Sequence, residues 1–226
     1  RVSERTPTLT DTRESRLVET FVTLTDNLVA DFDVLDVLQT LVDRSVELFD
    51  AAAGAIHLLN SQGELEVAAS TNERSEFIGL LQLNAGEGPC ITAVTSGELV
   101  TSHDLAELTR GWPRFAAASL QRGYVGVHAI PLRLREEVIG SLNLFRETEG
   151  ALNGIDARAA QALADVATIS VLQQRSLQSA TLASEQLQRA LDTKVAIEQA
   201  KGALMLGRNV SADKAFDLLL WRSQTT

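Results

Sequence analysis

Two β-hairpin patterns constrain the fold of this chain more than any other feature. Residues 53–60 and 64–70 are joined by the turn residues Ser61-Gln62-Gly63. Residues 124–132 and 138–146 are rich in Val, Ile, Leu and Phe and are joined by a charged turn. Such runs separated by turn residues are typical of antiparallel strand pairs. Because helical and loop patterns lie between the two hairpins, the sequence predicts an α+β domain with an antiparallel sheet and helices stacked on one face.

Helical patterns also precede the first hairpin. Leu17, Phe21, Leu24 and Leu28 recur at spacings of three and four residues, which predicts an amphipathic helix. Asp33 is expected to cap a second helix. The apolar residues expected to face inward from this second segment are Leu35, Leu38, Val42 and Phe49. Between the hairpins, shorter helices are predicted over residues 73–82, 90–96 and 112–122, with a short strand at 98–102.

Composition and charge narrow the class of protein. Of 226 residues, 45% are hydrophobic, which suffices for an ordinary core. No apolar run is long enough to cross a membrane and no signal peptide is evident, so a cytoplasmic protein is expected. The net charge of −10 argues against nucleic-acid binding by the whole molecule. The acidic excess lies within residues 1–150, so the near-neutral remainder leaves RNA contact open.

The phrases GEGPCITAVTSGELV (residues 86–100), SHDL, WPRFAAASL and AIPLRLREEVIGSLNLF (ending at Phe145) resemble the GAF family of sensor domains. The resemblance covers residues 17–174. It implies a GAF-like antiparallel sheet with a possible small-molecule pocket between the sheet and residues 77–105, for which Phe77, Cys90 and His103 are the candidate residues. Two of these residues have an alternative role that involves no ligand. Cys90 could be a small apolar residue that fills space in the core, and His103 could lie in a surface loop.

The residues give no support for catalysis, a metal or a cofactor. The three histidines are far apart in sequence and none has a second ligand at helical spacing, so we expect no metal site. His57 and His128 lie in strand patterns and are expected to be sheet residues. A phosphate-binding loop followed by Lys and Ser or Thr, a Ser-His-Asp arrangement and a paired-carboxylate setting are all lacking in the sequence. We therefore predict a protein that is not an enzyme.

A long stretch poor in Gly and Pro, residues 153–193, predicts that the last helix of the sensor domain continues as a linker. Val166, Leu177, Leu187 and Leu191 suggest a coiled-coil seam along it. Other core positions of the same register hold Ser170, Gln173 and Ser184, so the coiled coil is expected to be weak and broken. Together with the N-terminal helix, this seam predicts a homodimer.

The C-terminal residues predict an all-α helical hairpin. A first helix is expected to end near Leu206, before Gly207, and Ser211 is expected to begin a second one. The apolar residues expected to hold the second helix in place are Ala215, Phe216, Leu219 and Leu220. Lys194, Lys201 and Arg208 are spaced by seven residues and form one basic stripe, which fits either a solvated helix face or a phosphate-binding edge.

The string AIEQAKGALM, followed by S-x-x-x-AF and LL-x-x-S, resembles the ANTAR family of RNA-binding antiterminator domains. The motif positions are Ile197, Ala200, Lys201, Gly202, Met205, Ala215, Phe216 and Ser223. The resemblance implies binding of structured RNA hairpins through Lys194, Lys201 and Arg208. The family's third helix would follow Thr226, so the sequence is expected to be a piece of a longer protein. DNA is an unlikely partner, since no recognition helix is evident.

The sequence thus predicts four regions: a flexible lead-in (1–12), a GAF-like sensor domain (13–174), a helical linker (175–189) and a partial ANTAR-like domain (190–226). The predicted function is a sensory regulator, in which a small-molecule or protein signal controls an RNA-binding output and transcription antitermination. The alternative is a sensory dimerisation scaffold that acts through protein partners.

Overall fold

The computed structural model describes residues 12–26, 33–208, 211, 213–214, 217 and 220, with only part of the side chains from residue 182 onward. The chain separates into two compact units, Arg1–Gln173 and Gln174–Thr226. The predicted lead-in lies outside the described residues, apart from Thr12. Among the described residues, no helix is long and apolar enough to span a membrane.

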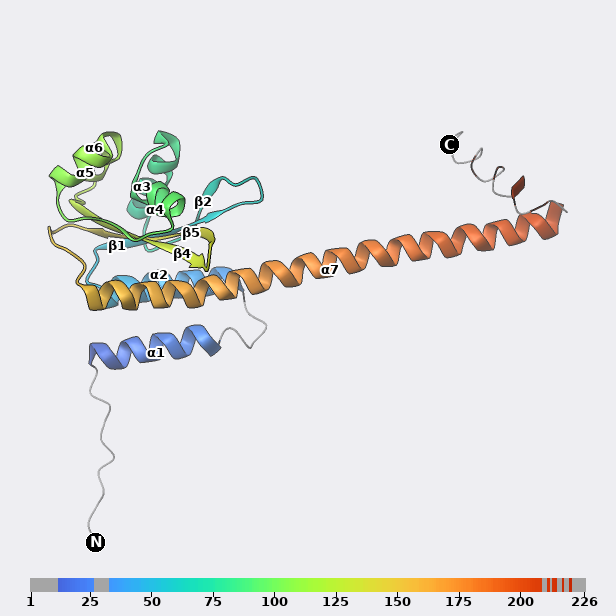
Figure 1. Ribbon diagram of the computed structural model, residues 1–226, viewed down its shortest axis with the longest axis horizontal. Helices are drawn as coiled ribbons and strands as arrows, with labels where there is room; N and C mark the ends of the chain where they lie inside the picture. Colours follow the sequence, from blue (N-terminus) through green and yellow to red (C-terminus); the bar gives the residue numbers. More distant parts are fainter. Residues whose placement is uncertain are drawn as a thin grey trace, which may run out of the picture. The chain divides into compact units, whose positions relative to one another are not determined.

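The first unit is built on one five-stranded antiparallel sheet with the strand order β2-β1-β5-β4-β3 (Figure 1). Its strands are β1 (Ala53–Leu59), β2 (Leu65–Ser70), β3 (Val100–Ser102), β4 (Gly126–Leu134) and β5 (Glu137–Arg146). Both predicted hairpins are confirmed, and pairing of β1 with β5 joins them into one sheet. The second hairpin turn is tighter than expected, because Leu134 pairs with Glu137 and Arg135 takes a left-handed conformation with φ 56°.

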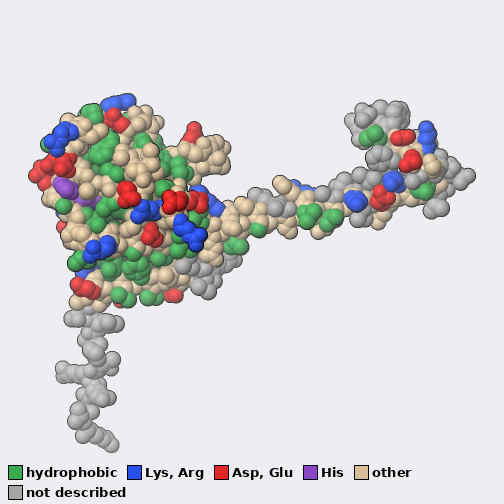
Figure 2. Space-filling view, viewed as in Figure 1, with side chains coloured by type: hydrophobic (Ala, Val, Ile, Leu, Met, Phe, Trp, Pro, Cys, Tyr) green, Lys and Arg blue, Asp and Glu red, His purple; other side chains and the backbone are tan. Residues whose placement is uncertain are grey.

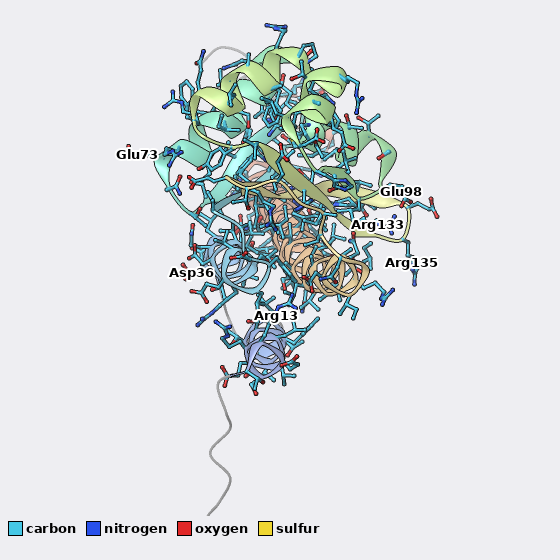
Figure 3. The ribbon with its side chains drawn as sticks, turned by 90° about the vertical axis from the view of Figure 1, so that its left-hand side faces the viewer. Arg13, Asp36, Glu73, Glu98, Arg133 and Arg135 are labelled. Carbon is cyan, nitrogen blue, oxygen red and sulfur yellow. The ribbon has the colours of Figure 1, made fainter. Side chains whose placement is uncertain are left out.

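Three helices cover one face of this sheet: α1 (Arg13–Asp26), α2 (Val34–Leu48) and the first part of α7 (Gly154–Arg208). Seen end-on, α2 and α7 lie side by side under the sheet with α1 below them (Figure 3). Asp33 caps α2 as predicted, accepting a hydrogen bond from the Leu35 backbone N–H at 2.9 Å. The inward orientation predicted for Leu35 is wrong. Its side chain is 58% exposed, because nothing among the described residues covers the first turn of α2 there.

The opposite face of the sheet carries α3 (Glu73–Ala85), α4 (Pro89–Ser96), α5 (Leu105–Gly111) and α6 (Pro113–Gln121). The expectation that helices stack on one face only is therefore wrong. The reason lies in the strands, since β4 and β5 are buried on both faces. Val127 and Phe145 pack toward α5 and α6, whereas Leu142 belongs to the core shared with α1, α2 and α7.

The long helix α7 spans 55 residues and continues from the first unit into the second, as the lack of Gly and Pro predicted. It ends at Arg208, two residues beyond the predicted end. A second helical segment follows, in which the Lys214 backbone N–H donates to Ser211 Oγ at 3.4 Å. Ala215, Phe216 and Leu219 lie outside the described residues.

Candidate functional site

The basic stripe of the second unit lies on the C-terminal part of α7. Lys194 and Lys201 are seven residues apart, which is close to two helical turns, so they lie on one side of the helix. Lys194 is exposed, and Lys201 is partly covered. Arg208 is the last residue of the helix, and its side chain is not among those described. Figure 2 shows basic side chains at the surface along this part of the helix.

Glu198 pairs with the lysine that lies in the ANTAR-like motif. Lys201 Nζ is 3.0 Å from Glu198 Oε1 and 3.2 Å from Oε2. The Glu198 side chain is 59% exposed, so this pair contributes little to stability. An exposed pair of this kind separates readily, which leaves the Lys201 ammonium available to a phosphate.

The predicted pocket residues of the first unit have three different environments. Phe77 is 41% exposed on α3, and the Arg122 guanidinium lies 4.0 Å from the centre of its ring. His103 follows β3 and is also partly exposed, with Nδ1 3.8 Å from Glu107 Oε2. Among the described residues, no contact joins Phe77 to His103, and neither residue contacts Cys90.

Cys90 lies in the first turn of α4 and is completely buried. Its backbone N–H donates to Gln82 Oε1 at 3.1 Å. Burial raises the pKa of the thiol to about 12, and a hydrogen bond with Ser141 only partly opposes this. A thiol with such a pKa is a poor nucleophile. The geometry therefore favours the buried-filler interpretation of Cys90.

A buried polar network lies next to Cys90, between the sheet and α3. Asn143 Nδ2 lies 2.8 Å from His57 Nδ1 and donates to Ser141 Oγ at 3.2 Å. Burial lowers the pKa of His57 to about 4, so the ring is neutral near pH 7; the Gly79 backbone acts in the opposite direction. Sequence reasoning missed this network. The available signal was the pair of polar residues, Ser141 and Asn143, inside an otherwise apolar strand.

An open groove of about 570 Å³ lies at the edge of this same layer, between the β1–β2 hairpin and helices α3 and α4. Its lining is mainly aliphatic, with one carboxylate, and consists of Leu59, Gly63, Glu64, Leu65, Leu83, Asn84, Ile91, Val94 and Thr95. It falls between the sheet and residues 77–105, where the sequence predicted a pocket. None of Phe77, Cys90 and His103 lines it.

His57 and His128 are strand residues in β1 and β4, as predicted, and both are buried. Within the described part of the chain, no group of three His, Cys, Asp or Glu side chains is placed to hold a metal ion.

Solved structures with a similar fold include several GAF domains. The GAF domain of a phosphoenolpyruvate-protein phosphotransferase from Coxiella burnetii is 19% identical, covers 74% of this chain and 99% of its own, and has a TM-score of 0.59. The corresponding domain from Acinetobacter is 16% identical, covering 70% and 94%, with a TM-score of 0.57. Free methionine-R-sulfoxide reductase from Neisseria meningitidis, solved with its substrate, is 19% identical, covering 73% and 91%, with a TM-score of 0.57. At these identities the likeness concerns the fold alone.

A search of curated proteins finds no match to the chain. Two family models do match it. The GAF domain model matches residues 33–171, and the ANTAR domain model matches residues 185–226. The first match includes the whole sheet and the second includes Lys194 and Lys201. The chain therefore belongs to the GAF domain family and carries an ANTAR domain after its GAF domain.

Proposed function

We propose that this protein is a sensory regulator whose GAF unit receives a signal and controls RNA binding by its ANTAR domain, and thereby transcription antitermination. The observation that carries the proposal is the presence of both domains in one chain, with α7 contributing residues to both. The protein acts in the cytoplasm in this proposal. The role needs neither catalysis nor a cofactor.

The RNA contacts in this proposal are made by Lys194, Lys201 and Arg208. Basic side chains spaced along one side of a helix can follow a phosphate backbone, and each contact releases counterions. Hairpin RNA presents a dense backbone charge together with accessible loop bases. The proposed ligand is therefore structured RNA with hairpins, and the paired Lys201 exchanges Glu198 for a phosphate when RNA binds.

The signal enters through the GAF unit in this proposal. The groove beside β2 and α4 offers aliphatic walls and only one charged side chain, Glu64, which suits an uncharged small molecule. Phe77, Cys90 and His103 remain our predicted pocket residues, although Cys90 is accessible only if α4 moves. A ligand that binds the native protein raises its melting temperature. A thermal-shift screen of metabolites and nucleotides tests this part.

The salt dependence of RNA affinity tests the proposed stripe. Lys201→Glu is expected to weaken hairpin binding and to lower the slope of log affinity against log salt by about one. Arg175→Glu is a matched control, since Arg175 is exposed on the same helix but precedes the ANTAR match. Equal effects of the two variants would reject the stripe. The alternative function, a dimerisation scaffold acting through protein partners, would then be favoured.

A further inference from the structure

Basic side chains gather near β3 on the face of the sheet that α1, α2 and α7 cover. His128 pairs with Thr101 on one side and with Leu144 on the other, while Gly126 pairs with Arg146. Residues two apart in a strand point to the same face, so His128 and Arg146 are diagonal neighbours on it. Gly126 adds no side chain between them. A Cβ there would lie 3.8 Å from Arg146 Cβ and 3.7 Å from the His103 carbonyl oxygen.

Two nitrogen atoms of this group are buried without a hydrogen-bond partner. The His128 residue is 1% exposed, its Nδ1 lies 2.5 Å from Thr101 Oγ1, and its Nε2 has no partner among the described residues. Arg146 Nε is likewise buried and has no partner in the described part of the chain, and Arg146 Nη2 makes a long contact of 3.4 Å with Thr148 Oγ1. Leaving buried polar atoms unpaired is costly, which indicates that something else completes this site.

The charged groups that act on His128 are basic. Burial, and after it the charges of Arg146 and His103, lower the pKa of His128 from 6.5 to about 4. Glu107 accepts from the His103 backbone N–H at 2.8 Å, and its Oε2 lies 3.8 Å from His103 Nδ1. Among the described residues, Arg146 forms no ion pair. In the described part of the chain, no acidic side chain therefore pairs with Arg146, and the carboxylate of Glu107 lies beside His103 instead.

We propose that His128, Arg146 and His103 form a binding site for a small oxyanion, a phosphate or carboxylate group carried by a metabolite. When Thr101 donates to His128 Nδ1, the neutral ring carries its proton on Nε2. An oxyanion can then accept from both Nε2–H of His128 and Nε–H of Arg146. His103 lies on the solvent side, where its partly exposed ring provides access. The site is on the other face of the sheet from the groove and does not depend on RNA binding.

Anion binding at this site must be linked to protonation of His128. A bound negative charge favours the charged imidazolium, so it raises the pKa of His128 from about 4. By reciprocity, the anion binds more tightly as the pH falls toward the pKa of the bound state. The charged and titratable groups around His128 are Arg146 on β5 and His103 after β3, and Glu107 contacts His103.

Nuclear magnetic resonance of the histidine rings tests the proposal in the whole protein, which has three histidines. Sulfate is a suitable probe, because its charge is constant over the range in which histidine titrates. With sulfate, we expect the His128 signals to shift and its pKa to rise relative to chloride at the same ionic strength. His57, buried on the opposite face, is the internal control and should not respond. Equal responses of His57 and His128, or no response from either, would overturn the proposal.

Arg146→Gln keeps a polar side chain and removes the charge. It is expected to weaken sulfate binding by about tenfold, the usual effect of losing one charge-assisted hydrogen bond. Arg135→Gln is the control, since Arg135 is exposed in the β4–β5 turn (Figure 3) and should leave sulfate binding unchanged. Equal affinities of the two variants would contradict the site. If Arg146→Gln does not fold, two measurements still test the site: the sulfate affinity of His103→Gln and the histidine titration of the unmodified protein.

Discussion

The core of the GAF unit has no room for a side chain at Gly79. A Cβ at this position would lie 2.5 Å from His57 Nε2 and 3.3 Å from Val67 Cγ2. Both neighbours are held by the sheet, so they have little room to move. We predict that Gly79→Ala destabilises the protein by about 1–3 kcal/mol, the usual cost of overpacking. Urea unfolding measures the change.

The control for this substitution is Gly111→Ala, because a Cβ on Gly111 meets no atom within 4 Å. Alanine there is expected to leave the free energy of unfolding unchanged or to raise it slightly, since Gly111 is helical. A Gly79→Ala protein as stable as the Gly111→Ala protein would mean that His57 is not fixed against α3.

His57 also makes a specific contribution to the pH dependence of stability. Burial lowers the pKa of His57 from 6.5 to about 4, so the unfolded chain binds the proton first as the pH falls. The stability that the neutral ring contributes is complete above pH 6.5 and is lost between pH 6.5 and about 4. In His57→Gln, the free energy of unfolding should therefore decrease less between pH 6.5 and about 4 than in the unmodified protein. Urea unfolding at a series of pH values measures this decrease.

Among the helices and strands, α7 has one side on which an apolar residue is followed by basic residues. Leu187, Lys194 and Lys201 are spaced by seven residues, so an apolar position gives way to basic ones on the same side of the helix. Leu177 and Leu187 are each 62% exposed and Leu191 is 49% exposed. Exposed leucines in one register suit the same helix of a second copy, although Ser184 interrupts the seam.

We predict that Leu187→Glu weakens the homodimer, because it places a charge at each side of the seam. Light scattering at micromolar concentration should show a dimer for the unmodified protein and a shift toward monomer for the variant. Gln186→Glu is the matched control, as it adds the same charge at the adjacent exposed position. A monomeric unmodified protein would contradict the dimer.

The elements that the sequence predicted best are those with strong local signals. The two hairpins, the Asp33 cap and the Gly97 end of α4 follow from turn and cap residues that act within a few positions. Helix α5 was missed, since it has seven residues and only Leu108 among them is fully buried. The buried His57–Asn143 contact joins residues 86 apart and depends on the pairing of β1 with β5, which no local pattern specifies.

In the whole molecule, the two units carry different kinds of candidate site. The first unit is an acidic GAF domain with an aliphatic groove and a buried neutral network. The second carries the lysines of the ANTAR domain. Of the candidate RNA-binding residues, Lys201 lies in the contiguous ANTAR-like motif, whereas Lys194 and Arg208 were proposed from their seven-residue spacing. The groove was predictable only as a region, since its lining comes from two strands and two helices that the fold brings together.

The affinity of the whole protein for tandem hairpin RNA, compared with a scrambled single strand of equal length, tests whether this protein recognises structured RNA. Both RNAs carry the same total charge, but the paired stems have the higher charge density, so the comparison is made over a salt series. We predict clearly tighter binding to the hairpins at physiological salt, with that preference lost in Lys201→Glu. Equal affinity for the two RNAs would contradict an RNA-binding output for this regulator.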